Sequence, residues 1–186
     1  MNKVQTDPRC PLCNSRCPTT LHILNGCPVA LNQGRYTWRH DSVLANIVSF
    51  LSPLLDKDQQ LFADLPGHRA SNAPLATIPT DILPTPFRPD LVLRCVSEIR
   101  LLELTICSNT IEGFSNARSR KQSKQEYAEL VGDLESKGYS VTYDTIEVGS
   151  LGHYTPSTHK ALRLFCLLYT SPSPRDQRGS RMPSSA

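Results

Sequence analysis

Four residues near the amino terminus have the side-chain types and spacing of a metal site. They form the pattern C-x2-C-x8-H-x4-C and are Cys10, Cys13, His22 and Cys27. Zinc prefers four thiolate or imidazole ligands in a tetrahedron. A segment this short has no room for a hydrophobic core, so a metal would have to hold it. The pattern predicts a CCHC zinc knuckle over residues 1–33; the alternative is incidental cysteines, with Cys17 as a rival ligand.

Two acidic residues, Asp90 and Glu103, stand among leucines and valines in the middle of the chain. A carboxylate in a buried sheet needs something to compensate its charge. A divalent cation would do so, and Mg²⁺ typically binds one or two carboxylates together with water and phosphate oxygens. The two acids therefore predict a magnesium site, unless they are solvated acids on an edge strand.

A β-hairpin would bring these two acids together. Residues 90–96 and 99–106 are β-prone and are separated by two polar residues. We expect Val96 to pair with Ile99. Because side chains alternate along a strand, this register would make the two carboxylates diagonal neighbours on one face.

A group of basic residues follows the hairpin: Arg118, Arg120, Lys121 and Lys124. Such a run is usually the solvated face of a helix. Beside paired carboxylates, however, one of the lysines could steer the phosphate that is cut or assist the attacking water. The same cations could also hold DNA phosphates.

Periodicity predicts the elements that would position these residues. A helix with an apolar face is expected to begin with Asp41 as its cap and to end before Pro53. A second helix is expected over residues 117–137, with Gly138 as its stop, and residues 139–148 alternate as a strand. The two helical stripes are Val43, Leu44, Ile47, Val48 and Leu51, and Tyr127, Leu130, Val131 and Leu134. Two strands, a helix and a third strand predict an α/β domain.

Composition limits the remaining possibilities. The 186 residues, 39% of them apolar, suffice for one globular domain and a small module. The net charge of +3 is too small to indicate nucleic-acid binding by itself. No run reaches the roughly 18 apolar residues of a membrane helix, and the polar start lacks the apolar core of a signal peptide. We expect a nuclear or otherwise intracellular protein that does not bind a membrane.

Two segments are predicted to be irregular. Six prolines from Pro66 to Pro89 suggest a surface loop over residues 64–88. The Ser/Pro/Arg-rich residues 166–186 predict a disordered tail, and from residue 167 they resemble translated sequencing-adapter DNA. That tail holds three arginines and one aspartate, so without it the charge falls from +3 to +1. The isolated Cys95, Cys107 and Cys166 are interpreted as small hydrophobic residues.

Several segments in order resemble the C-terminal region of non-LTR retrotransposon proteins that use a restriction-like endonuclease. The resemblance covers about residues 10–159. Its segments are the knuckle, Gly34-Arg35-Tyr36-Thr37-Trp38-Arg39-His40-Asp41, Arg88-Pro89-Asp90-Leu91-Val92-Leu93, Glu103-Leu104-Thr105, the lysine-rich helix ending near Tyr127, and Ile146-Glu147-Val148-Gly149-Ser150-Leu151-Gly152-His153.

This resemblance implies a PD-(D/E)xK nuclease fold over residues 34–165, a small mixed sheet with flanking helices. It makes Asp90 and Glu103 the Mg²⁺ ligands. Thr105 stands where many such nucleases carry their lysine.

In this family the lysine comes instead from the following helix, in a Lys-x-x-Lys-Tyr pattern. Lys121 and Lys124 fit the pattern, whereas Tyr127 lies three residues after Lys124 rather than directly after it. All three are therefore candidate catalytic residues, and the choice between the two lysines stays open.

The implied activity is the nicking of target DNA, so that the exposed 3′ end primes reverse transcription. The expected partners are DNA and, in addition, the RNA of the element. No segment resembles the polymerase, and the start at Met1 immediately before the knuckle suggests a fragment. The alternatives are a nucleic-acid-binding knuckle beside a catalytically inactive α/β remnant, and a relic without present function.

Overall fold

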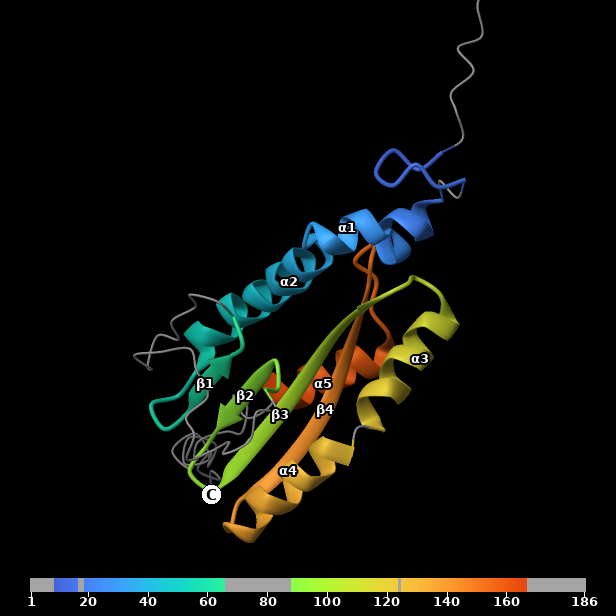
Figure 1. The fold of residues 1–186 in the computed structure, drawn as a ribbon. Helices are drawn as coiled ribbons and strands as arrows, with labels where there is room; N and C mark the ends of the chain where they lie inside the picture. The colour runs from blue at the N-terminus through green and yellow to red at the C-terminus, as the bar shows by residue number, and fades with distance from the viewer. Residues whose placement is uncertain (1–8, 17–18, 66–87, 124, 167–186) are drawn as a thin grey trace, which may run out of the picture.

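The computed structural model describes residues 9–16, 19–65, 88–123 and 125–166. A four-stranded sheet with the strand order β1-β2-β3-β4 forms the centre of the molecule (Figure 1). The strands are β1 (Gln60–Ala63), β2 (Leu91–Arg94), β3 (Glu98–Cys107) and β4 (Ser140–Gly149). Strand β2 pairs antiparallel with both β1 and β3, whereas β4 runs parallel to β3. The prediction of a small mixed sheet is confirmed.

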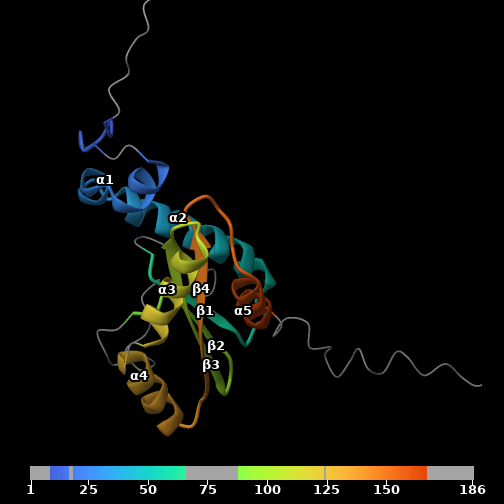
Figure 2. The ribbon, with the colours of Figure 1, turned by 90° about the vertical axis from the view of Figure 1, so that its right-hand side faces the viewer.

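Helices cover both faces of this sheet, as Figure 2 shows. On one face lie α2 (Arg35–Leu51) and α5 (Pro156–Cys166), and on the other lie α3 (Ile111–Gln122) and α4 (Gln125–Ser136). Before α2 the chain forms a short π-helix, η1 (His22–Gly26), and α1 (Pro28–Asn32); after it comes a 3-10 turn, η2 (Ser52–Leu54). The molecule is therefore a three-layered α/β fold with a small module at its amino end.

Each face of the sheet has its own core. Under α2 and α5 the buried residues include Leu44, Val48, Leu51, Leu91, Leu93, Leu102, Leu104, Ile146 and Phe165. Under α4 they are Phe62, Val92, Ile99, Leu101, Tyr127, Leu130 and Leu134. The two predicted helical stripes thus lie in the cores. No helix in the described ranges has the length and apolarity needed to cross a membrane.

The helix predicted from Asp41 begins six residues earlier, at Arg35, so its predicted start was wrong. Gly34 precedes it with a left-handed φ of 69°, which a glycine adopts without strain. The additional turns are held by contacts with the amino-terminal module, where Tyr36 packs against its small core. Such contacts leave no trace in the periodicity of the helix itself.

The hairpin forms with a register two residues away from the predicted one. Leu91 pairs with Leu102 and Arg94 with Ile99, while Val96 lies in the turn and is 81% exposed. The predicted pairing of Val96 was therefore wrong. A shift of two residues keeps every side chain on its face, because side chains alternate with a period of two.

Three further elements differ from the prediction. Residues 60–63, for which no element was predicted, form β1, whose Leu61, Phe62 and Ala63 are all buried and hence show no alternation. The single helix expected over residues 117–137 is divided into α3 and α4. Helix α4 ends at Ser136, shortly before the predicted stop Gly138, whose φ is 90°. Helix α5 was not predicted. The proline-rich residues 66–87, Cys17, Lys124 and the tail from residue 167 lie outside the described residues.

Candidate functional site

The predicted zinc ligands gather at one point of the amino-terminal module. One ligand atom from each of Cys10, Cys13, His22 and Cys27 lies within 4.8 Å of all the others. The Sγ atom of Cys13 is 3.2 Å from Nε2 of His22. Ligands at tetrahedral zinc distances are separated by about 3.5–3.8 Å, so a small adjustment would close the site around an ion. The cluster could hold a metal such as zinc.

The electrostatics of the cluster suit a metal as well. The hydroxyl of Ser15, 3.3 Å from Cys13 Sγ, and the backbone N–H of Ser15 lower the pKa of Cys13 to about 6. Burial has the opposite effect on Cys27 and raises its pKa. The thiolate is the form that binds a metal, and a cation among these sulfur atoms would favour it in both residues.

Helix α2 holds the amino-terminal module through hydrogen bonds. The Tyr36 hydroxyl accepts a hydrogen bond from the Cys27 N–H at 2.8 Å and donates one to the Ile23 carbonyl at 3.1 Å. The Arg39 guanidinium donates to the Leu24 carbonyl at 2.8 Å. The long helix thus fixes the module to the rest of the molecule.

A second candidate site lies around the two predicted acids. The Asp90 carboxylate accepts a hydrogen bond from the Leu104 N–H at 2.7 Å and lies 3.5 Å from Nε2 of His40. Glu103 is only 1% exposed. The Lys121 ammonium donates to one of its carboxylate oxygens and the Tyr127 hydroxyl to the other.

The sheet and the break between two helices produce this arrangement. Asp90 immediately precedes β2, and continuing the observed register places it opposite Glu103 on β3. Lys121 belongs to the last turn of α3 and Tyr127 to the first turn of α4. Because the chain turns between these helices, both residues reach the same carboxylate. A stacked ring pair, Tyr127 on Tyr143 at 4.8 Å, keeps the phenol in place.

Charges are strongly coupled in this acidic centre. Burial, followed by the negative charge of Asp90, raises the pKa of Glu103, while Lys121 and Tyr127 oppose the shift. Burial and Glu103 raise the pKa of Tyr127, so its phenol stays a neutral donor. The hydrogen bond with Asp90 raises the pKa of His40 to about 9, so that imidazole is protonated at neutral pH.

The contact of His40 was not predicted from the sequence, and Arg118 and Thr105 have surroundings other than those expected. His40 lies fifty positions from its partner Asp90 in the chain, and no local sequence pattern predicts a contact over such a separation. Arg118, a candidate for DNA phosphates, instead forms an ion pair with the buried Glu147. The Thr105 hydroxyl is buried without a hydrogen-bond partner among the described residues.

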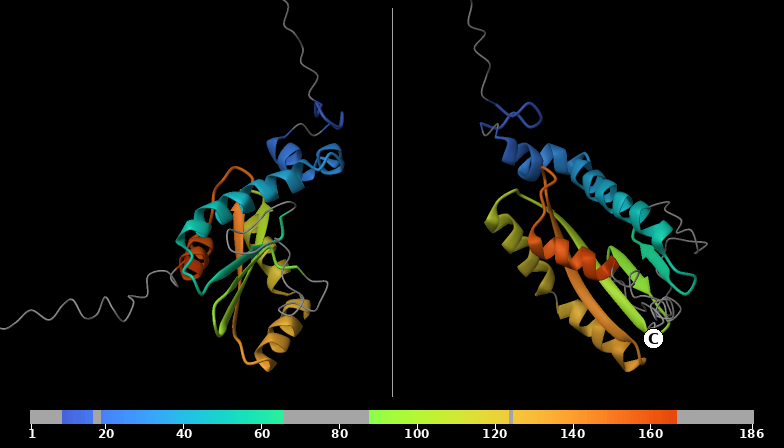
Figure 3. Two further views of the ribbon diagram at one scale, coloured as in Figure 1. Left: turned by 90° about the vertical axis from the view of Figure 1, so that its left-hand side faces the viewer. Right: turned by 180° about the vertical axis from the view of Figure 1, so that it is seen from behind.

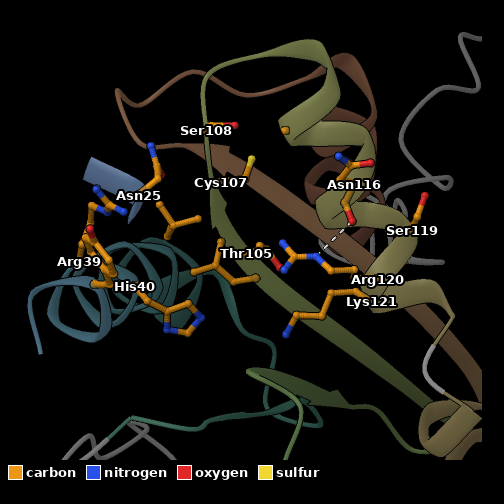
Figure 4. Close-up of a pocket in the computed structure, with 14 residues that line it drawn as sticks. Asn25, Arg39, His40, Thr105, Cys107, Ser108, Asn116, Ser119, Arg120 and Lys121 are labelled. Carbon is orange, nitrogen blue, oxygen red and sulfur yellow. Dashed lines mark hydrogen bonds between the residues drawn. The ribbon is translucent and has the colours of Figure 1, made fainter. Parts of the chain in front are cut away.

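A cavity of about 810 Å³ adjoins the acidic centre. Arg39 and His40 line it from α2, and Arg120 and Lys121 from α3, with Thr105 of β3 between them (Figure 4). The arrangement thus combines two carboxylates with an open space that is lined by cations.

The acidic centre and the cysteine cluster differ in their capacity for metals. Within the described ranges the Cys/His cluster is the only group of three or more His, Cys, Asp or Glu ligands gathered so closely. The acidic centre offers two carboxylates, and each oxygen of Glu103 already accepts a hydrogen bond. A carboxylate oxygen has a second lone pair, so these bonds leave room for a cation that completes its shell with water.

Comparison of the chain with protein-family models and with curated proteins gives no match.

Proposed function

We propose that this protein is a metal-dependent DNA endonuclease of the PD-(D/E)xK type, from the C-terminal region of a non-LTR retrotransposon protein. The observation that carries the proposal is the contact of Lys121 with Glu103 beside Asp90. Two acids and a lysine from different elements meet at one place, and this combination can support metal-assisted phosphodiester hydrolysis.

Each residue has a definite task in such a reaction. Mg²⁺ held by Asp90 and Glu103 would supply a Lewis acid for the phosphate. Lys121 stabilises the negative charge that develops on the phosphate oxygens. Tyr127 fixes the orientation of Glu103, and the protonated His40 does the same for Asp90. Water attacks phosphorus, the bond to the 3′ oxygen breaks, and the 3′ hydroxyl leaves with a proton.

A plasmid-nicking assay tests this proposal. Supercoiled DNA is incubated with the parent protein in Mg²⁺ or Mn²⁺, and the rate of relaxation is compared with that of Asp90→Asn, which can still accept the bond from Leu104. We expect the variant rate to fall by at least about a hundredfold, the effect of losing one strong electrostatic catalyst. The matched control is Glu112→Gln, an exposed acid in the first turn of α3.

The melting temperature of each variant separates catalysis from folding. An Asp90→Asn variant that melts like the parent and relaxes the plasmid at the parental rate would sink the nuclease proposal. In that case the second candidate function, nucleic-acid binding without cleavage, would remain. Its supporting observation is that each carboxylate oxygen of Glu103 already accepts a hydrogen bond, from Lys121 and from Tyr127, which compensates the buried charge without a metal.

A further inference from the structure

The cavity beside the acidic centre has the properties of an anion site. Its volume of about 810 Å³ lies within the range of roughly 300–1,000 Å³ that is typical of ligand sites. Two arginines, a lysine and a histidine line it, and no Asp or Glu is among its lining residues. Cations on two facing helices with no intervening acid favour a ligand that carries negative charge.

Two of these cations have hydrogen-bonding capacity left over. Lys121 contacts Glu103, and His40 contacts Asp90. Arg39 and Arg120, in contrast, have no carboxylate partner in the described part of the chain. Arg39 contacts the Leu24 carbonyl through one terminal nitrogen, and its Nε is buried without a partner. A buried donor without a partner costs free energy, which an anion would recover if a small shift of the side chain brought it within reach of Nε.

The Thr105 hydroxyl is a second, independent observation that favours a ligand in the cavity. It lies on the cavity wall, and its oxygen is buried without a hydrogen-bond partner among the residues described. Valine would fill the same space in a strand without a polar atom, so the fold has no need of this hydroxyl. The oxygen is screened from solvent, so a ligand in the cavity would accept its proton after a small shift of the side chain.

We propose that this cavity binds a phosphodiester of the DNA strand adjacent to the phosphate that is cut, held by Arg39, Arg120 and Thr105. The inference rests on the proposed nuclease function, which it extends to the path of the strand. A guanidinium matches the two non-bridging oxygens of a phosphate, and a hydroxyl donates to the same group. Because Lys121 lies both on the cavity wall and on Glu103, a phosphate bound here is next to the acidic centre.

Fluorescence anisotropy with a short labelled DNA duplex measures this binding. The buffer contains neither chelator nor Mg²⁺, so the zinc cluster is left intact and cleavage is not required. Arg120→Gln is expected to weaken binding about tenfold and to lower the slope of log affinity against log salt by about one, the signature of one lost phosphate contact. The control is Arg163→Gln, an exposed arginine on α5 at the other face of the sheet.

Thr105→Val separates a ligand contact from a structural role. It removes a hydroxyl that has no partner within the described protein, so the melting temperature should stay equal or rise. DNA binding should nevertheless weaken about fivefold or more, since hydrogen bonds to charged groups are among the strongest. If Thr105 had only a structural role, Thr105→Val would lower the melting temperature and leave DNA binding unchanged.

The outcomes distinguish this inference from the nuclease proposal. If Arg120→Gln and Thr105→Val bind DNA with the parental affinity and salt slope, or if the parent shows no binding, the inference is overturned. If the parent protein still nicks plasmid DNA in that case, the nuclease proposal stands without this inference. Conversely, weaker binding by both variants supports a phosphodiester site in the cavity; if Asp90→Asn leaves nicking unchanged, only the nuclease function and the position relative to a cut phosphate are lost.

Discussion

At the scale of single residues, the most informative side chain is that of Glu103. A carboxylate that is 1% exposed is costly, and here a lysine neutralises it while a tyrosine hydroxyl binds its other oxygen. The neighbouring Asp90 adds repulsion and raises the pKa of Glu103 further. Coupled, shifted groups of this kind are concentrated at functional sites, because catalysis needs charges that a fold alone would avoid.

The pair of His40 and Asp90 predicts a pH-dependent stability. The pKa of His40 is raised from 6.5 to about 9 in the folded protein, so its stabilising effect is complete below about pH 6.5 and is lost as the pH rises through about 9. Denaturant unfolding of the parent in Mg²⁺-free buffer should therefore show a falling free energy over this interval. His40→Gln should lack that part of the decrease.

The comparison of variants removes the contribution of other groups that titrate in the same interval, such as the cysteines. His159→Gln, an exposed histidine of α5, serves as the control and should keep the parental pH dependence. Identical pH profiles for the parent and His40→Gln would contradict the assigned contact.

At the scale of elements, a buried ion pair fixes α3 against the sheet. Both oxygens of Glu147 on β4 accept from Arg118 of α3, and Thr158 of α5 hydrogen-bonds the Glu147 backbone at 3.0 Å. The same guanidinium reaches Thr155 at 3.2 Å. Lys121 lies three residues after Arg118, on the same side of the helix. The pair thus positions the lysine that contacts Glu103.

Breaking this pair from one side should be costly. Arg118→Ala would leave the buried Glu147 without its cation, and we expect the free energy of unfolding to fall by about 3 kcal/mol. The double variant Arg118→Met with Glu147→Leu removes both charges and should recover most of the loss. Denaturant unfolding measures both, with Arg163→Ala as an exposed control. If Arg118→Ala lowers the free energy of unfolding by less than Arg163→Ala does, the ion pair contributes nothing to stability.

At the scale of the whole molecule, two parts with separate cores are joined by α2. The module core of Cys10, Cys27 and Ala30 is distinct from the two cores of the sheet. The module lies at the amino end of α2, beyond the ends of the strands (Figure 3), where Asn25 contacts Ser150 directly after β4. Asn25 of the module nevertheless lines the cavity, so the amino-terminal module contributes to the proposed DNA site.

Loss of the metal should therefore disturb the module and leave the sheet folded. We expect about one equivalent of zinc, by mass spectrometry of metals, in protein purified without chelator. Cys13→Ser should lose the zinc and become sensitive to protease before residue 35, while the sheet cores, which contain no module residue, still unfold cooperatively. Cys95→Ser, a half-buried cysteine outside the cluster, should keep its zinc. Parent protein free of zinc would refute the assignment.

Local sequence patterns were sufficient to predict several parts of the molecule. The spacing of Cys10, Cys13, His22 and Cys27 predicted the ligand cluster, because close pairs of ligands form chelating turns. Alternation predicted that Asp90 and Glu103 face the same side, and this prediction tolerates a two-residue error in register. Helical periodicity predicted the buried stripe of α2, since core contacts recur with the helical repeat.

Only the tertiary structure decided which distant residues meet. The contacts of His40 with Asp90 and of Arg118 with Glu147 join different elements, and short-range periodicity carries no information about such pairs. Strand β1, with three consecutive buried residues, lacked the alternation that marks a half-exposed strand. The sequence by itself therefore determined the candidate ligands and the faces they occupy. Packing between helices and sheet decided that Lys121 contacts Glu103, since packing alone sets the distance between elements that are far apart in the chain.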